Sequence, residues 1–334
     1  MILPNYSLLL SLLFFFNNLT IITVSRRYLT YKGVQLIAIF LNIFFLFSCL
    51  FYWKFYILDQ GQTAISLKLN SNNWANINYE INLKLSSISF LFVLLVSVIG
   101  NDTNIYILNY FKYEERGEEF ILLINWFIFS MIFLVISNNL FSLIVGWELI
   151  GLTSFLLINF WRLKVSTLGC SFKAFTFNKV SDIFLMIGFC LLWNTYKTSN
   201  VDTILTLINL NPNNSIETLR KAAICILISS SIKSAQFIGH LWLPDSMEAP
   251  VPASSLIHSA TLVSAGIYLL LKFQSLFYHT GLMDSIFFIG SLTACFGGLV
   301  AAGQSDMKKL LAYSTISHCG FIFASISLNN YILS

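Results

Sequence analysis

Residues 225–266 read CILISSSIKSAQFIGHLWLPDSMEAPVPASSLIHSATLVSAG, an apolar stretch that holds one lysine and, further along, three prolines. Lys233 comes eleven positions before the first proline, so a helix here would carry the charge far from both of its ends. Proline lacks an amide hydrogen and clashes with the preceding turn, so no continuous helix passes through the prolines. We expect a helix that breaks there and restarts near the last of them. The three are Pro244, Pro250 and Pro252.

The composition of the whole chain excludes a soluble globular protein. Of the 334 residues, 57% are hydrophobic and only 10% are charged, whereas soluble domains have about 25% charged residues. The apolar residues form continuous runs and do not alternate with polar ones, which favours membrane-spanning helices over a transmembrane β-barrel. We predict an all-α polytopic membrane protein with about ten transmembrane helices. The predicted segments are 8–24, 34–57, 87–109, 120–137, 139–161, 174–196, 221–243, 253–273, 284–303 and 309–328.

Two polar stretches interrupt this apolar pattern, residues 59–86 and residues 198–220, and both are expected to be solvent-exposed loops.

The N-terminal residues lack a basic region and an arginine-rich presequence, so they predict a first membrane helix instead of a cleaved targeting segment. The net charge of +4 comes from scattered loop residues, which gives no support to a nucleic-acid partner. Membrane lipids are the expected surroundings.

Glu148, Lys179 and Asp182 are ionisable residues inside predicted membrane segments, where an unpaired charge costs several kcal/mol. Glu148 lies near the centre of its segment, too far from either end for its side chain to reach water. It either belongs to a proton pathway or is a protonated glutamate that hydrogen-bonds a neighbouring helix. Lys179 and Asp182 are three residues apart and share a helix face, so a structural ion pair is the alternative to a relay.

Lys233 belongs to a polar stripe on an otherwise apolar helix, because Ser229, Lys233, Gln236 and His240 follow one another at spacings of four, three and four residues. Desolvation disfavours the charged form of a buried lysine, so such a residue can bind and release a proton near neutral pH. The alternative is a fixed structural cation that is paired with Glu148.

Two further histidines are candidates for proton transfer. His258 lies one to two turns after the proline break, and imidazole can pass a proton on either nitrogen near neutral pH. His318 lies among serine and threonine residues of the last segment and is explained equally well by a packing role. The predicted proton-relay residues are Glu148, Lys179, Asp182, Lys233, His240, His258 and His318.

The six cysteines lie mostly inside apolar segments and form no C-x-x-C pair, so they are expected to be small apolar residues of the packing. The sequence also has no metal-ligand pairing, nucleophile elbow or phosphate-binding loop. We therefore expect no catalytic residue, bound metal or cofactor on this chain. The pattern predicts the movement of ions across a membrane.

Four motifs carry a family resemblance: GWELIG (146–151), NKVSD (178–182), the stretch from Lys233 to Gly266, and SDMKKLLAYSTISHCGF (305–321). They resemble the antiporter-like chain 5 family of respiratory NADH:ubiquinone oxidoreductase (complex I), whose relatives include the Mrp-type sodium/proton antiporter subunits. The resemblance implies the first inverted repeat of the antiporter-like fold, with a broken seventh helix. It implies that Glu148 tunes Lys233 and that His258 hands protons along the membrane axis. Asp182 matches the aspartate of the family's sixth helix.

Membership of this family would make the chain the input half channel and central relay of a proton-translocating NADH dehydrogenase. NADH, FMN, iron–sulfur clusters and ubiquinone would be used by other subunits of the complex. Family members continue through the rest of a second inverted repeat and a long lateral helix, which have no counterpart in this sequence. We therefore expect a split gene, in which a separate polypeptide supplies those helices, and a neighbouring antiporter-like subunit as partner.

The predicted organisation has three parts: residues 1–119 with three membrane helices and the polar loop, residues 120–273 with the proton-channel repeat, and residues 274–334 with the start of a second repeat. A composition rich in Phe, Asn and Tyr favours an organelle-encoded protein of the mitochondrial inner membrane. Two alternatives remain. One is a subunit of a stand-alone Mrp-type Na⁺/H⁺ antiporter, and the other is a structural subunit with an inactive channel.

Overall fold

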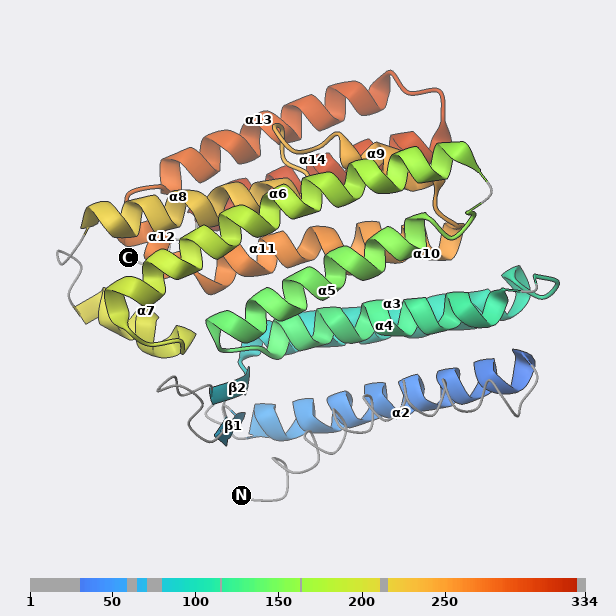
Figure 1. Ribbon diagram of the computed structural model, residues 1–334, viewed down its shortest axis with the longest axis horizontal. Helices are drawn as coiled ribbons and strands as arrows, with labels where there is room; N and C mark the ends of the chain where they lie inside the picture. Colours follow the sequence, from blue (N-terminus) through green and yellow to red (C-terminus); the bar gives the residue numbers. More distant parts are fainter. Residues whose placement is uncertain are drawn as a thin grey trace. The chain divides into compact units, whose positions relative to one another are not determined.

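The computed structural model describes residues 31–58, 65–70, 80–114, 116–162, 164–210 and 216–328 of the chain (Figure 1). The chain divides into two compact units, one that ends at Ser137 and one that begins at Asn138. All seven predicted relay residues lie in the second unit.

The described part of the first unit contains three long helices and a hairpin of two antiparallel strands. These elements are α2 (Tyr31–Leu58), β1 (Ile65–Asn70), β2 (Glu80–Leu85), α3 (Ser87–Tyr110) and α4 (Gly117–Ile136). One buried asparagine from each helix joins a shared network, in which Asn42 and Asn104 donate to Asn125 Oδ1 at 2.9 and 3.3 Å. Such bonds hold helices together where apolar packing in lipid gives little driving force.

The described part of the second unit is a bundle of helices of unequal length. Its elements are α5 (Leu140–Ile158), α6 (Val165–Tyr196), α7 (Val201–Leu210), α8 (Ile216–Lys233), α9 (Trp242–Asp245), the 3₁₀ turn η1 (Ser246–Glu248), α10 (Val251–Leu256), the π-helical turn η2 (Ile257–Thr261), α11 (Leu262–Lys272), α12 (Gln274–His279), α13 (Met283–Ala302) and α14 (Met307–Leu328). Two long pairs dominate the packing, α6 along α8 and α13 along α14. The second pair approaches closely at Gly290, where an added Cβ would lie 2.6 Å from the backbone nitrogen of Ala324.

Eight helices of the described residues are long and apolar enough to cross a membrane, and many of their large apolar side chains are exposed. On α13, Phe288 and Leu299 are 64% and 77% exposed, as expected for side chains that face lipid. These helices confirm the prediction of an all-α polytopic membrane protein. The predicted segment 8–24 lies outside the described residues.

Both polar stretches contain secondary structure where loops were expected. The first holds the β1–β2 hairpin, in which Ile65 pairs with Leu85. The second holds α7, whose buried Val201, Ile204 and Ile208 recur at helical spacing and give this short segment one apolar face. A loop prediction based on composition missed these elements, because short amphipathic elements carry enough polar residues to resemble loops.

The start of α6 is also earlier than predicted, at Val165 instead of residue 174. The added turns contain Thr167 and Ser171, whose hydroxyls donate to the backbone carbonyls of Lys164 and Leu168. Since these side chains satisfy their hydrogen-bonding groups within the helix, polar residues extend α6 beyond its apolar part.

Candidate functional site

The helix that carries Lys233 ends at that residue, ten residues before the predicted segment end at 243. Two residues later Ala235 adopts a φ of +53°, a left-handed conformation that ends a helix. The backbone amide of Gln236 donates to the carbonyl of Ser231 at 2.8 Å, so part of the broken helix end is hydrogen-bonded by the returning chain.

Trp242 satisfies a further carbonyl at the break, because its indole Nε1 donates to the carbonyl of Ile232 at 3.0 Å. The predicted interruption at the prolines and the restart near Pro252 are observed, because Ala249 and Pro250 are extended and α10 begins at Val251, but an additional break stabilised by hydrogen bonds precedes the prolines and was not predicted. The predicted stripe of Ser229, Lys233, Gln236 and His240 was wrong because of this additional break, since only its first two residues lie on α8.

Lys233 is completely buried at the end of α8. Its Nζ donates to the backbone carbonyl of Trp147 at 3.3 Å and lies 4.9 Å from the centre of the Trp147 ring, within the range of a cation–π contact. Among the described residues, the closest carboxylate oxygen is Oδ1 of Asp182 at 3.9 Å. The ammonium is therefore held by a dipole, an aromatic face and a distant anion, without a close ion pair.

Asp182 is shared between two lysines. Its Oδ2 lies 3.4 Å from Nζ of Lys179, and Lys179 in turn forms a short ion pair with Glu148. Glu148, Lys179, Asp182 and Lys233 thus form a row of alternating charges, which we call the charge row. The alternative in which Glu148 neutralises Lys233 directly is not what the structure shows, because Glu148 binds Lys179.

The Glu148–Lys179 end of the charge row is partly exposed, and the Asp182–Lys233 end is buried. The side chains of Lys179 and Glu148 are 42% and 31% exposed, Asp182 is 4% exposed, and Lys233 has no exposed surface. The row therefore connects the surface of the second unit with its interior.

Several residues around the charge row were not among the predicted relay residues. Trp147 donates from Nε1 to Ser181 at 3.3 Å, and Ser181 donates to the carbonyl of Ser229 at 3.1 Å, which links α5, α6 and α8 beside the lysine. Both amide atoms of the buried Asn178 lack a hydrogen-bond partner among the described residues.

Gly151 leaves space next to the ammonium, because a Cβ there would lie 3.5 Å from Nζ of Lys233. The GWELIG motif was recognised for its glutamate alone, yet it also supplies the tryptophan and the glycine that contact Lys233. Trp147 and Gly151 lie close to Glu148 on the same helix, and this proximity was the signal that could have indicated their role beside Lys233.

His258 lies in η2, where the chain adopts a wider π-helical turn between α10 and α11. The imidazole is 6% exposed, and its Nε2 lies 3.2 Å from the hydroxyl oxygen of Ser246 in η1. π-helical turns occur frequently at functional sites. The structure thus places this histidine inside the second unit, next to the interrupted segment.

Among the described residues, no hydrogen bond or ion pair joins the other two predicted histidines to the charge row. His240 follows the helix break, where its Nδ1 bonds the carbonyl of Phe237 at 2.7 Å and its ring contacts Phe296 of α13. His318 is exposed on α14. A relay role for either residue stays a prediction.

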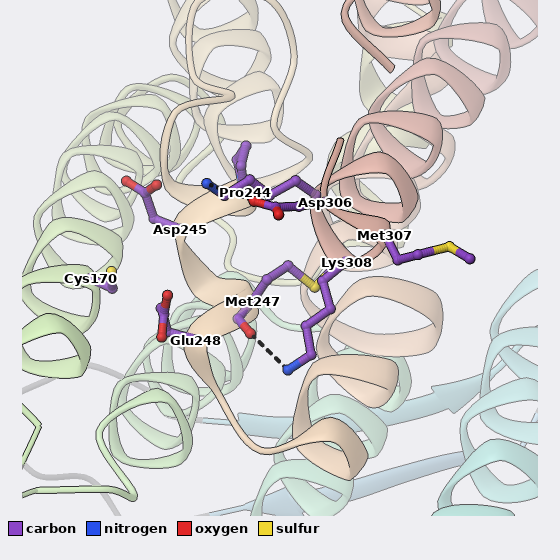
Figure 2. Close-up of a pocket in the computed structure, with 9 residues that line it drawn as sticks. Cys170, Pro244, Asp245, Met247, Glu248, Asp306, Met307 and Lys308 are labelled. Atoms are coloured by element: carbon purple, nitrogen blue, oxygen red, sulfur yellow. Dashed lines mark hydrogen bonds and ion pairs between the residues drawn. The ribbon is translucent and has the colours of Figure 1, made fainter. Parts of the chain in front are cut away.

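A pocket of about 340 Å³ lies where η1 and the start of α14 meet (Figure 2). Asp245 and Glu248 line it, and Lys308 donates from across it to the carbonyl of Met247 at 3.5 Å. Asp245 also forms an ion pair with Lys173 of α6 at 2.5 Å. The interrupted segment is thus fixed by charged side chains on two neighbouring helices.

Comparison with known proteins supports these observations. A family model described as NADH:quinone oxidoreductase/Mrp antiporter, TM, matches residues 137–333. Among curated relatives, the NADH-ubiquinone oxidoreductase chain 5 of Paramecium tetraurelia is 41% identical over 92% of this chain and 55% of its own length. That of Wickerhamomyces canadensis is 35% identical over 95% of this chain and 49% of its own length. The chain therefore spans about half the length of these relatives.

Solved structures agree on the fold. A chain in the Mrp complex from Dietzia sp. DQ12-45-1b matches with a TM-score of 0.83 and 26% identity, over 96% of this chain and 34% of that one. A chain of an archaeal membrane-bound sulfane sulfur reductase, at 18% identity and a TM-score of 0.81 over 96% of this chain and 64% of its own, shares the fold alone. The helices and the charge row are consistent with the family match over residues 137–333. The chain belongs to the NADH:quinone oxidoreductase/Mrp antiporter membrane-subunit family.

Proposed function

We propose that the chain is a proton-translocating membrane subunit of an NADH:ubiquinone oxidoreductase, in which it forms the input half channel and the central relay. The observation that carries this proposal is the charge row, which ends at a fully buried lysine beside a helix break. Ionisable groups at membrane depth are costly and are retained for function. The similarity to chains named NADH-ubiquinone oxidoreductase chain 5 supports the same function.

Lys233 is the proposed group that gains and loses the proton. When it is charged, the ammonium is stabilised by Trp147 and by Asp182. When it is neutral, the charge of Asp182 is balanced by Lys179, which lies 3.4 Å away. Lys179 also pairs with Glu148, so the charge row stays electrically neutral after Lys233 loses its proton only if Glu148 gains one.

Glu148 is the proposed regulator of that equilibrium. While it is ionised, it binds Lys179 and leaves Asp182 free to attract the ammonium of Lys233. Protonation of Glu148 would release Lys179 to pair fully with Asp182, which makes the surroundings of Lys233 more positive and favours loss of its proton. A proton that arrives at Glu148 would thus drive one away from Lys233, and His258 would receive it.

We further propose that other subunits carry out the redox chemistry with NADH, FMN, iron–sulfur clusters and ubiquinone, and that this chain binds none of them. Its place would be the mitochondrial inner membrane, encoded in the organelle, beside another antiporter-like subunit. The partly exposed Glu148 and Lys179 favour a polar partner over lipid at that surface.

The half of the relatives' length that this chain does not match would complete the proton path, either on the same polypeptide or on a separate one. Within this chain, we propose that residues 120–273 form the channel repeat and that residues 274–334 begin the second repeat.

The test is to purify the membrane complex through an affinity tag on this chain, identify its polypeptides by mass spectrometry, and measure proton translocation during NADH oxidation. Flavin and iron–sulfur subunits in the preparation support the proposal. A complex without flavin that exchanges Na⁺ for protons would instead indicate a stand-alone Mrp-type antiporter. A redox complex in which substitution of Lys233 leaves translocation unchanged would indicate an inactive, structural channel.

A further inference from the structure

Ser246 lies at the start of η1, between Asp245 and Met247, which line the pocket, but Ser246 itself is not part of the lining and is completely buried. Its hydroxyl oxygen makes two contacts. One is with the carbonyl oxygen of Leu243 at 2.6 Å, and the other is with Nε2 of His258 at 3.2 Å.

The positions of the hydrogens follow from these two distances. Two oxygens 2.6 Å apart need a hydrogen between them, and a carbonyl cannot provide it, so the hydroxyl of Ser246 donates to Leu243. A serine hydroxyl has only one hydrogen. Towards His258, the Ser246 oxygen can therefore only accept, and the hydrogen must be on Nε2 of the histidine.

This assignment determines the state of the other ring nitrogen. A neutral imidazole with its hydrogen on Nε2 has a lone pair on Nδ1. In the structure, Nδ1 of His258 is buried and has no hydrogen-bond partner among the described residues. The ring is thus fixed at one nitrogen and available as a proton acceptor at the other.

The π-helical turn contributes to this orientation. Thr261 donates from Oγ1 to the carbonyl of Leu256, five residues earlier, at 3.0 Å, which matches the wider spacing of a π turn. His258 lies within that turn, and its Nε2 meets a serine twelve residues earlier in the sequence. The contact is therefore built by the interrupted segment and the π turn together.

We propose that Ser246 is a positioning residue for proton transfer by His258: it holds the imidazole with the hydrogen on Nε2 and so makes Nδ1 the atom that accepts the proton. The accepted proton forms an imidazolium that keeps its Nε2–H bond to Ser246, and loss of the Nδ1 proton restores the neutral ring. This inference rests on the proposed function of the chain, because it assigns a role within the relay.

The experiment compares protons translocated per NADH oxidised in the intact complex that carries Ser246→Ala, Ser246→Thr or Ser171→Ala. Loss of one hydrogen bond lowers the population of the correctly oriented imidazole by about two- to tenfold. Ser246→Ala is therefore expected to lower the ratio of protons to NADH by that factor. Ser246→Thr keeps the accepting oxygen and should restore the ratio. Ser171 is equally buried, and its hydroxyl donates to the carbonyl of Leu168 three residues earlier, so Ser171→Ala controls for the loss of a buried hydroxyl.

A double-mutant cycle with His258→Ala keeps the test decisive if the threonine does not fit the buried site. If Ser246 acts through the histidine, Ser246→Ala has no further effect on the ratio once His258 is replaced. An equal loss in both backgrounds, or no loss from Ser246→Ala alone while His258→Ala lowers the ratio, overturns the inference and leaves the relay intact. An unchanged ratio in His258→Ala overturns the proposed role of the histidine itself.

Discussion

Lys233 and Lys179 are both ion-paired with Asp182, but they lie in different surroundings. Lys233 is fully buried, and its nearest carboxylate oxygen within the described part of the chain is 3.9 Å away. Lys179 is 42% exposed and is bound closely by Glu148. A close ion pair stabilises the charged state of a lysine. When a lysine is buried and its anion is distant, the charged state is stabilised only weakly. The difference supports the proposal that Lys233 is the side chain that changes its charge and that Lys179 is a fixed counter-ion.

The largest expected effect comes from removing the buried cation. Lys233→Met keeps the length of the side chain but cannot carry a proton, and a positioned proton-transfer group contributes typically about a hundredfold. Proton translocation in vesicles should fall by about that factor while the complex still assembles, because Asp182 keeps its ion pair with Lys179 when the Lys233 ammonium is removed.

Lys221→Met is the matched control for this substitution. Lys221 is on the same helix, is exposed, and pairs with Glu217 one turn earlier. Translocation should be unchanged in this variant. Equal losses of translocation in both variants would show that α8 tolerates no methionine. The buried environment of Lys233 would then not be distinguished from the exposed environment of Lys221.

Asp182→Asn removes the anion that both lysines share, and its effect should be the second largest. We expect about a tenfold loss of translocation, together with a lower thermal stability of the complex, because breaking a buried ion pair leaves a charge uncompensated at a cost of about 3–5 kcal/mol. Translocation and melting temperature measured on the same preparation check this. A stable complex with normal translocation would mean that Lys233 does not depend on this aspartate.

Lys179→Gln tests the exposed end of the charge row. Exposed ion pairs contribute only about 0.2–1 kcal/mol, so translocation should fall by about two- to fivefold. Lys173→Gln is a close control, since Lys173 also lies on α6, is 41% exposed and pairs with a carboxylate of another helix. If the control lowers translocation as much as Lys179→Gln, surface charge on α6 matters and the charge row does not.

The smallest effect is expected from Gly151→Ala, which places a methyl group 3.5 Å from the ammonium of Lys233 without a steric clash. Translocation should change by less than about twofold, because a single van der Waals contact is worth only about 0.1–0.2 kcal/mol. Gly169→Ala on α6, where a Cβ would meet no atom within 4 Å, provides the comparison. A large loss in Gly151→Ala alone would show that the space beside Lys233 is part of the relay.

The amino-acid sequence alone predicted the membrane environment and most helix positions, because long apolar runs reflect the demand of the bilayer on every residue of a crossing segment. It also indicated Glu148, Lys179, Asp182 and Lys233, since charges inside such runs are conspicuous. The hairpin and α7 were missed because a short amphipathic element depends on the surface that its apolar residues cover, and composition does not show that surface.

Only the tertiary structure decided how these residues are connected. The helix ends at Lys233 because Ala235, Gln236 and Trp242 reverse the chain and satisfy its carbonyls, before any proline is reached. Glu148 binds Lys179 instead of Lys233, and Ser246 meets His258 across a π-helical turn. Pairings of this kind depend on distances of a few ångströms between separate helices, and a linear pattern of residues contains no such distances.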